Sequence, residues 1–244
     1  MKELNPKVLI FLALMVAVGL DCAYADTQSA WKQEISLGYS QKTGNTQNSQ
    51  LSGTYQGLRA TESEEITLKA STLYSSQKKK MDGQKHTGSA RYAPNLADTD
   101  WFVFAMTEAE HDRFAAIDYR LVPAVGAGYW FSNTRDWKAS AELGLGYEYV
   151  KYTDNSDEDN MAVIPRAYFE KAVFEKARIS EELIIYPNLK NGQKYRARSE
   201  TKFTNPLSEE MSMRVSFIDE FNTDPLGSAK KNDTQLLLSL VYTF

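Results

Sequence analysis

A histidine and several acidic residues lie close together near the middle of the chain. His111 is followed by Asp112 and preceded by Glu108 and Glu110. A carboxylate beside an imidazole can activate water or a hydroxyl, which is the chemistry of a lipid or peptide hydrolase. No serine or cysteine lies beside them in a recognisable nucleophile motif. A structural role is therefore favoured over a catalytic one, and no catalytic residue is assigned.

Two further groups of polar residues could bind ions. His86, the only other histidine, shares no ligand spacing with His111, so no zinc site is expected. Four carboxylates crowd a short segment and could hold a divalent cation through oxygen ligands: Asp154, Asp157, Glu158 and Asp159. Their spacing does not match the helix-loop-helix calcium site, and such runs are usually solvated loops. No metal or other cofactor is predicted.

The charged residues exclude one class of partner and leave another open. The net charge of −4 gives no basic surface of the kind that nucleic-acid binding requires. Lys78, Lys79 and Lys80 form a short basic run, which could contact phosphate groups as point charges. We expect no nucleic acid as a partner.

The end of the chain indicates which elements position these residues. Leu236, Leu238, Leu240, Tyr242 and Phe244 alternate with other residues, so one face of a strand of about ten residues is apolar and ends on an aromatic. This is the length and periodicity of a tilted strand that crosses a bilayer within a closed barrel.

Similar segments recur along the chain between polar turns, and they predict an all-β fold: a single-chain antiparallel transmembrane β-barrel of about twelve strands. The expected strands are 31–43, 46–58, 64–76, 85–95, 100–110, 117–131, 137–152, 161–174, 177–186, 194–205, 210–222 and 233–244. The clearest is 137–152, where Leu143, Leu145 and Tyr147 share one face and Glu142 the other. The segments 161–174 and 177–186 alternate less regularly.

The first residues predict an exported protein. Lys2 and Lys7 precede an apolar run, and Ala23 and Ala25 flank a cleavage position, so residues 1–25 read as a signal peptide and 26–244 as one barrel domain. Cys22, the only cysteine, falls in the part to be removed. The predicted location is the outer membrane of a Gram-negative bacterium. We therefore expect outer-membrane lipid and lipopolysaccharide as surroundings, and the run at 78–80 could contact lipopolysaccharide phosphates. An even number of strands places both ends at the periplasm, with longer outer loops expected at 77–84, 153–160, 187–193 and 223–232.

A transport function would reside in the lumen of this barrel. The expected lumen-lining residues are charged and lie on the faces opposite the apolar ones: Arg120, Lys138, Glu142, Glu148, Arg196, Arg198, Glu200 and Lys202, with Lys69 and Arg214 beside them. They can line a narrow pore, or pair across the lumen and close it, since twelve strands lie between filled and open barrels. Their basic excess favours anions if a pore exists. Gly126, Gly128, Gly144 and Gly146 relieve crowding at a curved wall or leave room for solute.

Three groups of residues carry a resemblance to a known family. They are Gly38-Tyr39-Ser40 with Thr43-Gly44-Asn45-Thr46, Asp112-Arg113-Phe114 with Ile117-Asp118-Tyr119-Arg120, and Asn222-Thr223-Asp224-Pro225 with the run from Ala229 to Thr234. The chain resembles the YdiY-like family, described as salt-induced outer-membrane proteins of largely unassigned function. The resemblance implies an outer-membrane barrel without catalytic residues. It also implies that the barrel-assembly machinery recognises the periplasmic terminal strand, with Tyr242 and Phe244 as the assembly signal. Ala116 stands where the pattern has a glycine, which leaves the local turn geometry open.

These observations leave three functions open. The first is a non-enzymatic outer-membrane barrel that serves envelope adaptation to salt or osmotic stress, or passes small solutes through a narrow lumen. The second is a barrel enzyme acting on lipid or peptide at the outer rim through His111 and Asp112. The third is an adhesion or lipopolysaccharide-organising scaffold that acts through the loops at 78–80 and 154–159. The sequence does not specify a solute or an oligomeric state.

Overall fold

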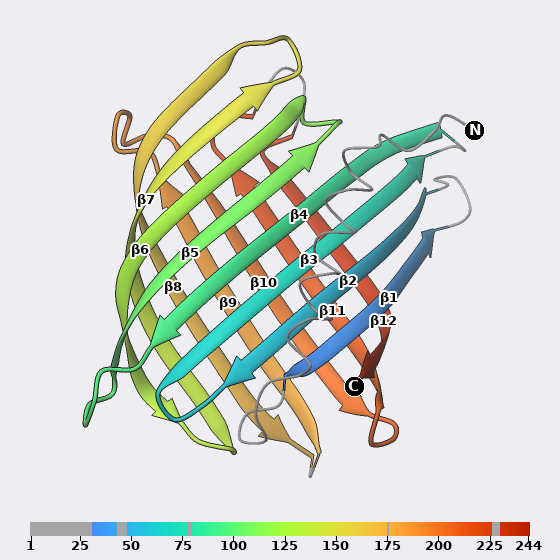
Figure 1. The fold of residues 1–244 in the computed structure, drawn as a ribbon. Helices are drawn as coiled ribbons and strands as arrows, with labels where there is room; N and C mark the ends of the chain where they lie inside the picture. The colour runs from blue at the N-terminus through green and yellow to red at the C-terminus, as the bar shows by residue number, and fades with distance from the viewer. Residues whose placement is uncertain (1–30, 43–47, 78–79, 175, 226–229) are drawn as a thin grey trace.

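The computed structural model describes residues 31–42, 48–77, 80–174, 176–225 and 230–244. Every regular element within them is a β-strand, and the strands close into one antiparallel barrel in which each strand pairs with its neighbours in the chain and β1 pairs with β12 (Figure 1). This confirms the predicted all-β barrel and its twelve strands. In these residues, no helix has the length and apolar character needed to cross a membrane. The predicted signal peptide, with Cys22, lies outside the described residues.

The strand bounds follow the alternating segments of the sequence. They are β1 Lys32–Lys42, β2 Asn48–Ala60, β3 Glu64–Gln77, β4 Lys80–Pro94, β5 Trp101–Asp112, β6 Ile117–Asn133, β7 Trp137–Tyr152, β8 Asp157–Val173, β9 Ala177–Pro187, β10 Tyr195–Pro206, β11 Met211–Asn222 and β12 Asn232–Thr243.

Two predicted outer loops are wrong in extent, because strands occupy most of 77–84 and half of 153–160. β4 begins at Lys80, five residues before the predicted start, and pairs with the end of β3 across an irregularity at Ser75 and Ser76. β8 begins at Asp157, because Asp157–Asn160 continue the ladder with β7. The difference in length between the two sets of loops is therefore smaller than predicted.

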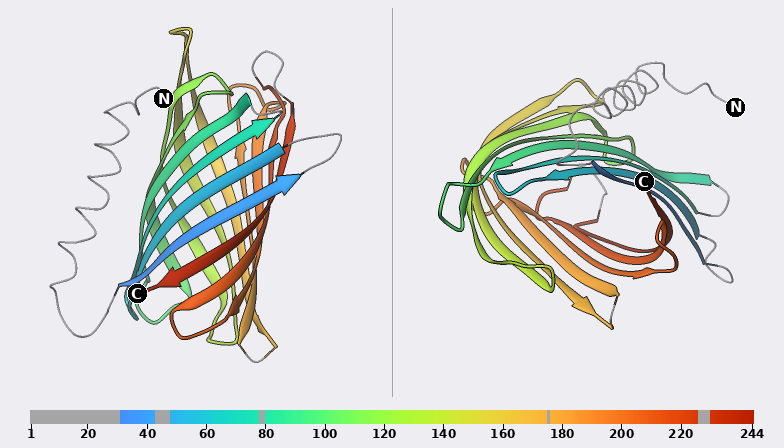
Figure 2. Two further views of the ribbon diagram at one scale, coloured as in Figure 1. Left: turned by 90° about the vertical axis from the view of Figure 1, so that its right-hand side faces the viewer. Right: turned by 60° about the horizontal axis from the view of Figure 1, so that its bottom comes forward.

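The barrel has two distinct ends. Trp31 and Phe244 lie at one of them, which we call the terminal end, where backbone hydrogen bonds join Gln33 and Phe244 in both directions. The opposite end, which we call the loop end, carries the connections after β5, β7, β9 and β11. The two views in Figure 2 show the wall from another side and, obliquely from one end, the strands that surround the lumen.

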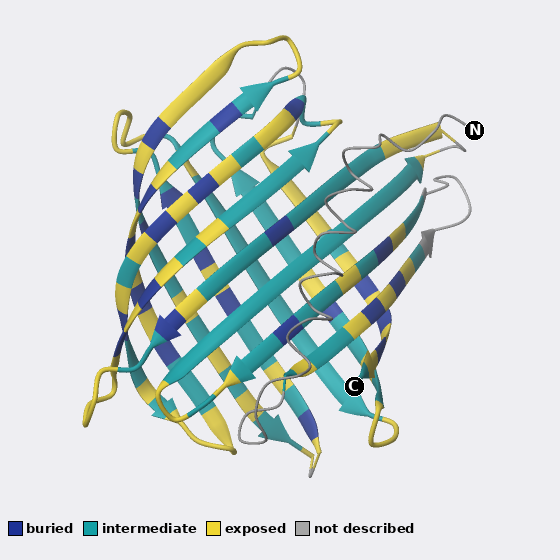
Figure 3. Ribbon diagram, viewed as in Figure 1, coloured by how far each residue is buried: buried dark blue, intermediate teal, exposed yellow. Residues whose placement is uncertain are grey.

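The outer wall is apolar because side chains along each strand point alternately outward and inward. On β7, Leu143 and Leu145 are exposed, whereas Glu142, Gly144 and Gly146, which alternate with them, are buried. The alternation is visible as coloured bands in Figure 3. Exposed aromatics gather toward both ends of this wall, as at bilayer interfaces: Trp101, Phe131, Trp137, Tyr242 and Phe244 near the terminal end, and Tyr39, Tyr119, Tyr147 and Tyr195 near the loop end.

One outward-facing residue of β9 breaks this rule. Glu181 lies between the exposed Ile179 and Leu183, and its carboxylate accepts hydrogen bonds from the Ser199 hydroxyl at 2.5 Å and from the Thr201 hydroxyl. The two hydroxyls of β10 replace part of the hydration that this carboxylate would have in water.

The closing contact between β1 and β12 is short. Only Glu34–Tyr39 of β1 pair with Leu238–Thr243 of β12, whereas β2 pairs with β1 along the whole of Lys32–Lys42.

Candidate functional site

The lumen contains two cavities that meet at mid-height. One, of about 400 Å³, lies toward the loop end, and the other, of about 680 Å³, lies toward the terminal end. Ten residues line both cavities, and we call them the belt: Glu34, Gln56, Lys69, Ser89, Glu108, Glu182, Ile184, Glu200, Lys202 and Arg214. The belt is where any solute that moves between the two cavities must pass.

The structure places the eight lumen-lining candidates on the inner wall. Arg120, Arg196 and Arg198 line the loop-end cavity, Glu200 and Lys202 belong to the belt, and Lys138 and Glu142 line the terminal-end cavity. Glu148 points inward from β7 and pairs with two of these arginines, Arg120 at 3.1 Å and Arg196 at 2.6 Å.

The most buried of these side chains is Glu142, which is 2% exposed. Its carboxylate pairs with Arg91 at 3.1 Å and with Arg166, and Arg166 in turn reaches Glu182 at 2.8 Å. Two guanidinium groups thus compensate the charge of Glu142, which a buried carboxylate requires. The network ties together β4, β7, β8 and β9.

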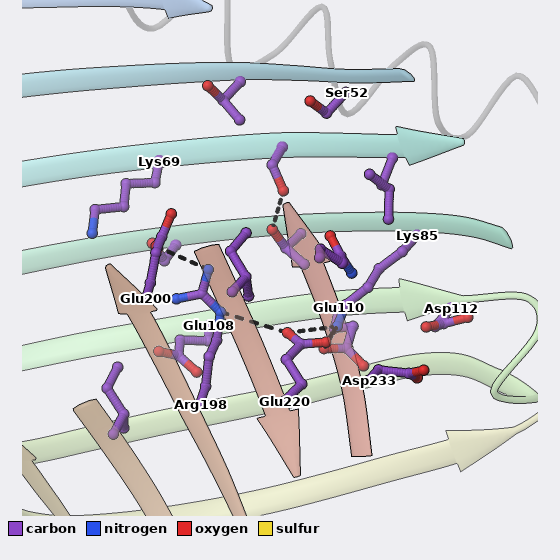
Figure 4. A pocket seen from close by; sticks show the side chains of 18 of the residues that line it. Ser52, Lys69, Lys85, Glu108, Glu110, Asp112, Arg198, Glu200, Glu220 and Asp233 are labelled. Atoms are coloured by element: carbon purple, nitrogen blue, oxygen red, sulfur yellow. Dashed lines mark hydrogen bonds and ion pairs between the residues drawn. The ribbon is translucent and has the colours of Figure 1, made fainter. Parts of the chain in front are cut away.

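A second network lies toward the loop end. Lys85 reaches across the lumen to Glu220 at 2.8 Å and lies 3.5 Å from Glu110, which also pairs with Arg120 at 2.7 Å. Figure 4 shows Lys85, Glu110 and Glu220 converging from three strands, with Arg198 beside them.

These networks correct the predicted basic excess. Several glutamates that were not among the predicted lumen residues also face the lumen, and they pair with most of its lysines and arginines: Glu34, Glu65, Glu110, Glu170, Glu182 and Glu220. Strand alternation was the available signal, because Glu110 follows the buried Phe102 and Phe104 at even spacing on β5. The basic excess that remains is confined to the terminal-end cavity, which Arg135 and Lys138 also line.

The glycines of β6 agree with the predicted relief of crowding at the wall and not with the predicted room for solute. A methyl group on Gly126 would lie 2.6 Å from the ring of Phe104, and one on Gly128 would clash with the ring of Phe102. Gly126 and Gly128 therefore let phenyl rings lie close against the wall and leave no room for solute at those points. Arg91 covers both rings, with its guanidinium carbon 5.5 and 5.3 Å from their centroids.

The predicted hydrolytic group is divided between the two faces of the wall. His111 faces outward and lies 2.7 Å from the carbonyl oxygen of Asp118, whereas Glu108 and Glu110 line the loop-end cavity. Asp112 accepts hydrogen bonds from two backbone N–H groups of the following turn. This geometry brings no carboxylate of the group to the imidazole.

The two histidines are neighbours, which their spacing in the chain did not indicate. His86 and His111 are directly opposite in the β4–β5 ladder, and their rings stack at 6.0 Å. His86 also lies 2.8 Å from the hydroxyl of Thr72 on the same outer face. Parallel rings at this distance do not direct two nitrogens at one metal ion.

The acidic loop is already partnered within the chain. Asp159 pairs with Lys190 at 2.8 Å, and Glu158 accepts a hydrogen bond from Tyr152. Asp154 accepts hydrogen bonds from the backbone and hydroxyl of Ser156, which lower the pKa of its carboxyl. Across the described strands and loops, no three or more histidines, cysteines or carboxylates converge as metal ligands. Lys78 and Lys79 lie outside the described residues, and Lys80 is exposed.

Solved structures with a similar fold are outer-membrane barrels. An outer-membrane channel from Pseudomonas putida F1 has a TM-score of 0.54 and 10% identity, and the match covers 90% of this chain and 97% of the channel. The NanC porin matches with a TM-score of 0.52 and 11% identity over 87% of this chain and 98% of the porin. The KdgM porin matches with a TM-score of 0.51 and 9% identity over 87% and 99%. These likenesses show a shared fold.

The sequence of the chain identifies its family, which the shared fold does not. No curated protein matches the chain. The model of a family described as "Protein of unknown function, DUF481" matches residues 35–244, which is nearly all of the predicted mature chain. The chain therefore belongs to the DUF481 family, the YdiY-like family whose motifs it carries.

Proposed function

We propose that this protein is a non-enzymatic barrel of the Gram-negative outer membrane that passes small solutes through a narrow, charged lumen. The observation that carries the proposal is the meeting of the two lumen cavities at the belt, because together they extend from one end of the barrel to the other. Charged side chains on both sides of the belt keep such a path hydrated. Similar folds in two porins and a channel support the proposal.

The orientation and partners belong to the same proposal. The terminal end faces the periplasm and the loop end faces outward, so the aromatic residues at the two ends lie at the two lipid interfaces. Lipid and lipopolysaccharide surround the wall, and the assembly machinery reads Tyr242 and Phe244, which lie on the outer wall with rings 5.8 Å apart. A role in adaptation to salt or osmotic stress rests on the family resemblance. It predicts that a deletion strain grows more slowly than its complemented strain at high salt.

The direct test is single-channel conductance of the refolded mature chain in a planar bilayer. A cysteine introduced at the belt residue Ser89 makes the test more specific. It would be the only thiol of the predicted mature chain, because Cys22, the only cysteine of the sequence, falls in the predicted signal peptide. In Ser89→Cys, a charged thiol reagent should reduce the conductance. Thr107→Cys is the matched control, since Thr107 faces outward from β5 and the same reagent should leave its conductance unchanged. A folded barrel without conductance would show that the lumen is closed and would direct attention to the loop end.

A further inference from the structure

One glutamate that lines the two cavities differs from the others. Each of the other glutamates that line either cavity pairs with at least one lysine or arginine, as Glu142 and Glu220 do. Among the described residues, Glu108 has no ion-pair partner. Its carboxylate accepts a hydrogen bond from the hydroxyl of Tyr186 at 2.7 Å, and this donor is neutral.

The surroundings of Glu108 make this lack of a cation costly. Val122 lies opposite Glu108 in the β5–β6 ladder, and Val122, Ile184 and Tyr186 belong to one buried apolar cluster. A carboxylate beside apolar side chains loses hydration, and a single neutral hydrogen bond does not compensate its charge. The guanidinium of Arg196 lies over the ring of Tyr186, with its carbon 4.5 Å from the centroid, and is paired with Glu148.

The pairing within the belt isolates the same charge. Glu34 pairs with Arg214 at 2.8 Å, Glu182 with Lys69 at 3.5 Å, and Glu200 with Lys202 at 3.1 Å. These three pairs use every cation of the belt. Glu108 is left as the one carboxylate of the belt without an ion pair, and only the more distant charges of Arg196 and Arg198, which are paired with other glutamates, act on it.

Neutral oxygen atoms lie near this charge. Ser89, also in the belt, is directly opposite Glu108 in the β4–β5 ladder, which places the two Cβ atoms about 5 Å apart. Gln56 adds an amide oxygen to the belt. In the part of the chain that the structure describes, no further histidine, cysteine or carboxylate completes a group of three around Glu108. These ligands suit a monovalent cation that stays partly hydrated and moves on, rather than a fixed divalent ion.

We propose that Glu108 makes the belt a transient binding site for monovalent cations, so that the pore conducts cations in preference to anions. This inference rests on the proposed pore and names the class of solute that the pore prefers. It replaces the preference for anions that the sequence suggested, because the passage between the cavities carries the opposite charge.

Lys138 opposes this preference from the terminal-end cavity. It lines that cavity and makes no ion pair within the described residues. Its charge repels cations on their way to the belt. Removal of Lys138 should therefore change selectivity in the direction opposite to removal of Glu108.

The test is the reversal potential in a KCl gradient across a planar bilayer. The wild-type barrel should prefer potassium. Glu108→Gln should lower the ratio of potassium to chloride permeability at least about five-fold, because one unit charge about 4 Å from an ion in water changes the binding of potassium by that factor and acts in the opposite direction on chloride. Lys138→Gln should raise the ratio. Glu181→Gln is the matched control: it removes the same charge from the outer wall and should leave the ratio unchanged. Tyr186→Phe, which keeps the charge of Glu108, should retain the preference for potassium.

The outcomes separate this inference from the proposed pore. A wild-type barrel that conducts but prefers chloride, or whose selectivity is the same in Glu108→Gln and Glu181→Gln, overturns the cation site and leaves the pore intact. A barrel that inserts without conducting overturns the pore and the inference with it. If Glu108→Gln does not fold, the Lys138→Gln ratio decides, since an unchanged or lower ratio contradicts the charge profile.

Discussion

The glycines of β6 offer a test of how closely the inner wall is packed. In Gly126→Ala, the new methyl group would meet the carbonyl oxygen of Leu143, the ring of Phe104 at 2.6 Å and the Cα atom of Gly144 at 2.7 Å. Two of these three atoms belong to the backbone of β7, which the ladder with β6 holds in place. The clash therefore cannot be relieved by a side-chain rotation alone.

The expected loss follows from two opposing contributions. Overpacking of a dense interior costs about 1–3 kcal/mol, and a clash with fixed backbone lies near the upper limit. Replacement of glycine by alanine within a strand regains about 0.5–1 kcal/mol of conformational entropy. Gly126→Ala should thus lower the free energy of unfolding by about 2 kcal/mol. In the control Gly53→Ala, the methyl group would meet only side-chain atoms, at 3.5 and 3.8 Å, so stability should stay the same or rise slightly.

The assay is equilibrium unfolding in urea of the barrel refolded into lipid vesicles, followed by tryptophan fluorescence and extrapolated to zero denaturant. A second pair of variants adds a specific check. Gly128→Ala would clash only with side chains, Phe102 and Glu142, so Phe102→Leu should recover much of its loss in a double-mutant cycle. Equal stabilities of Gly126→Ala and Gly53→Ala would refute the reasoning.

Three further changes have expected outcomes in the same or a related assay. Ala116→Gly should stabilise the barrel by about 0.5–1 kcal/mol. The reason is that Ala116 has a φ of 57°, a left-handed backbone conformation that costs an L-residue about 1–2 kcal/mol. A loss of stability would contradict this. Arg166→Met should lower the free energy of unfolding by about 2–3 kcal/mol. This is less than the roughly 3–5 kcal/mol that a fully uncompensated buried charge costs, because Glu142 keeps Arg91 and Glu182 keeps Lys69. A loss below about 1 kcal/mol, which is typical of exposed pairs, would count against this reasoning. Phe244→Ala should reduce the amount of folded barrel in outer-membrane fractions while the refolded protein keeps its urea midpoint, and unchanged assembly in cells would remove Phe244 from the assembly signal.

Much of the fold could be predicted from the sequence because membrane strands obey a two-residue period. On β7, Leu143 and Glu142 identify the outer and inner faces without any knowledge of their neighbours, and the predicted bounds of this strand agree with the structure. The predicted starts of β4 and β8 were several residues too late, because the first residues of both strands are mostly polar and show no apolar face. Outside the bilayer, pairing with β3 and β7 decides where these strands begin.

The pairing within the lumen could not be predicted from the sequence. Lys85 and Glu220 are 135 residues apart, and Arg214 and Glu34 are 180 apart. Which side chains meet depends on the tilt of the strands and on how the barrel closes, and neither has a local pattern. For the same reason, the sequence did not show that Glu108 lacks a cation.

The short contact between β1 and β12 also concerns how the protein reaches this structure. Every other ladder joins strands that are adjacent in the chain, so each can zip up locally as a hairpin. The contact between Glu34 and Thr243 instead closes a loop of roughly 200 residues, at an entropic cost on the order of 5 kcal/mol. Six pairs of residues must offset that cost. We therefore expect ring closure to be the last and slowest step of folding, and the ladder between β1 and β12 to be the first to open when the barrel unfolds.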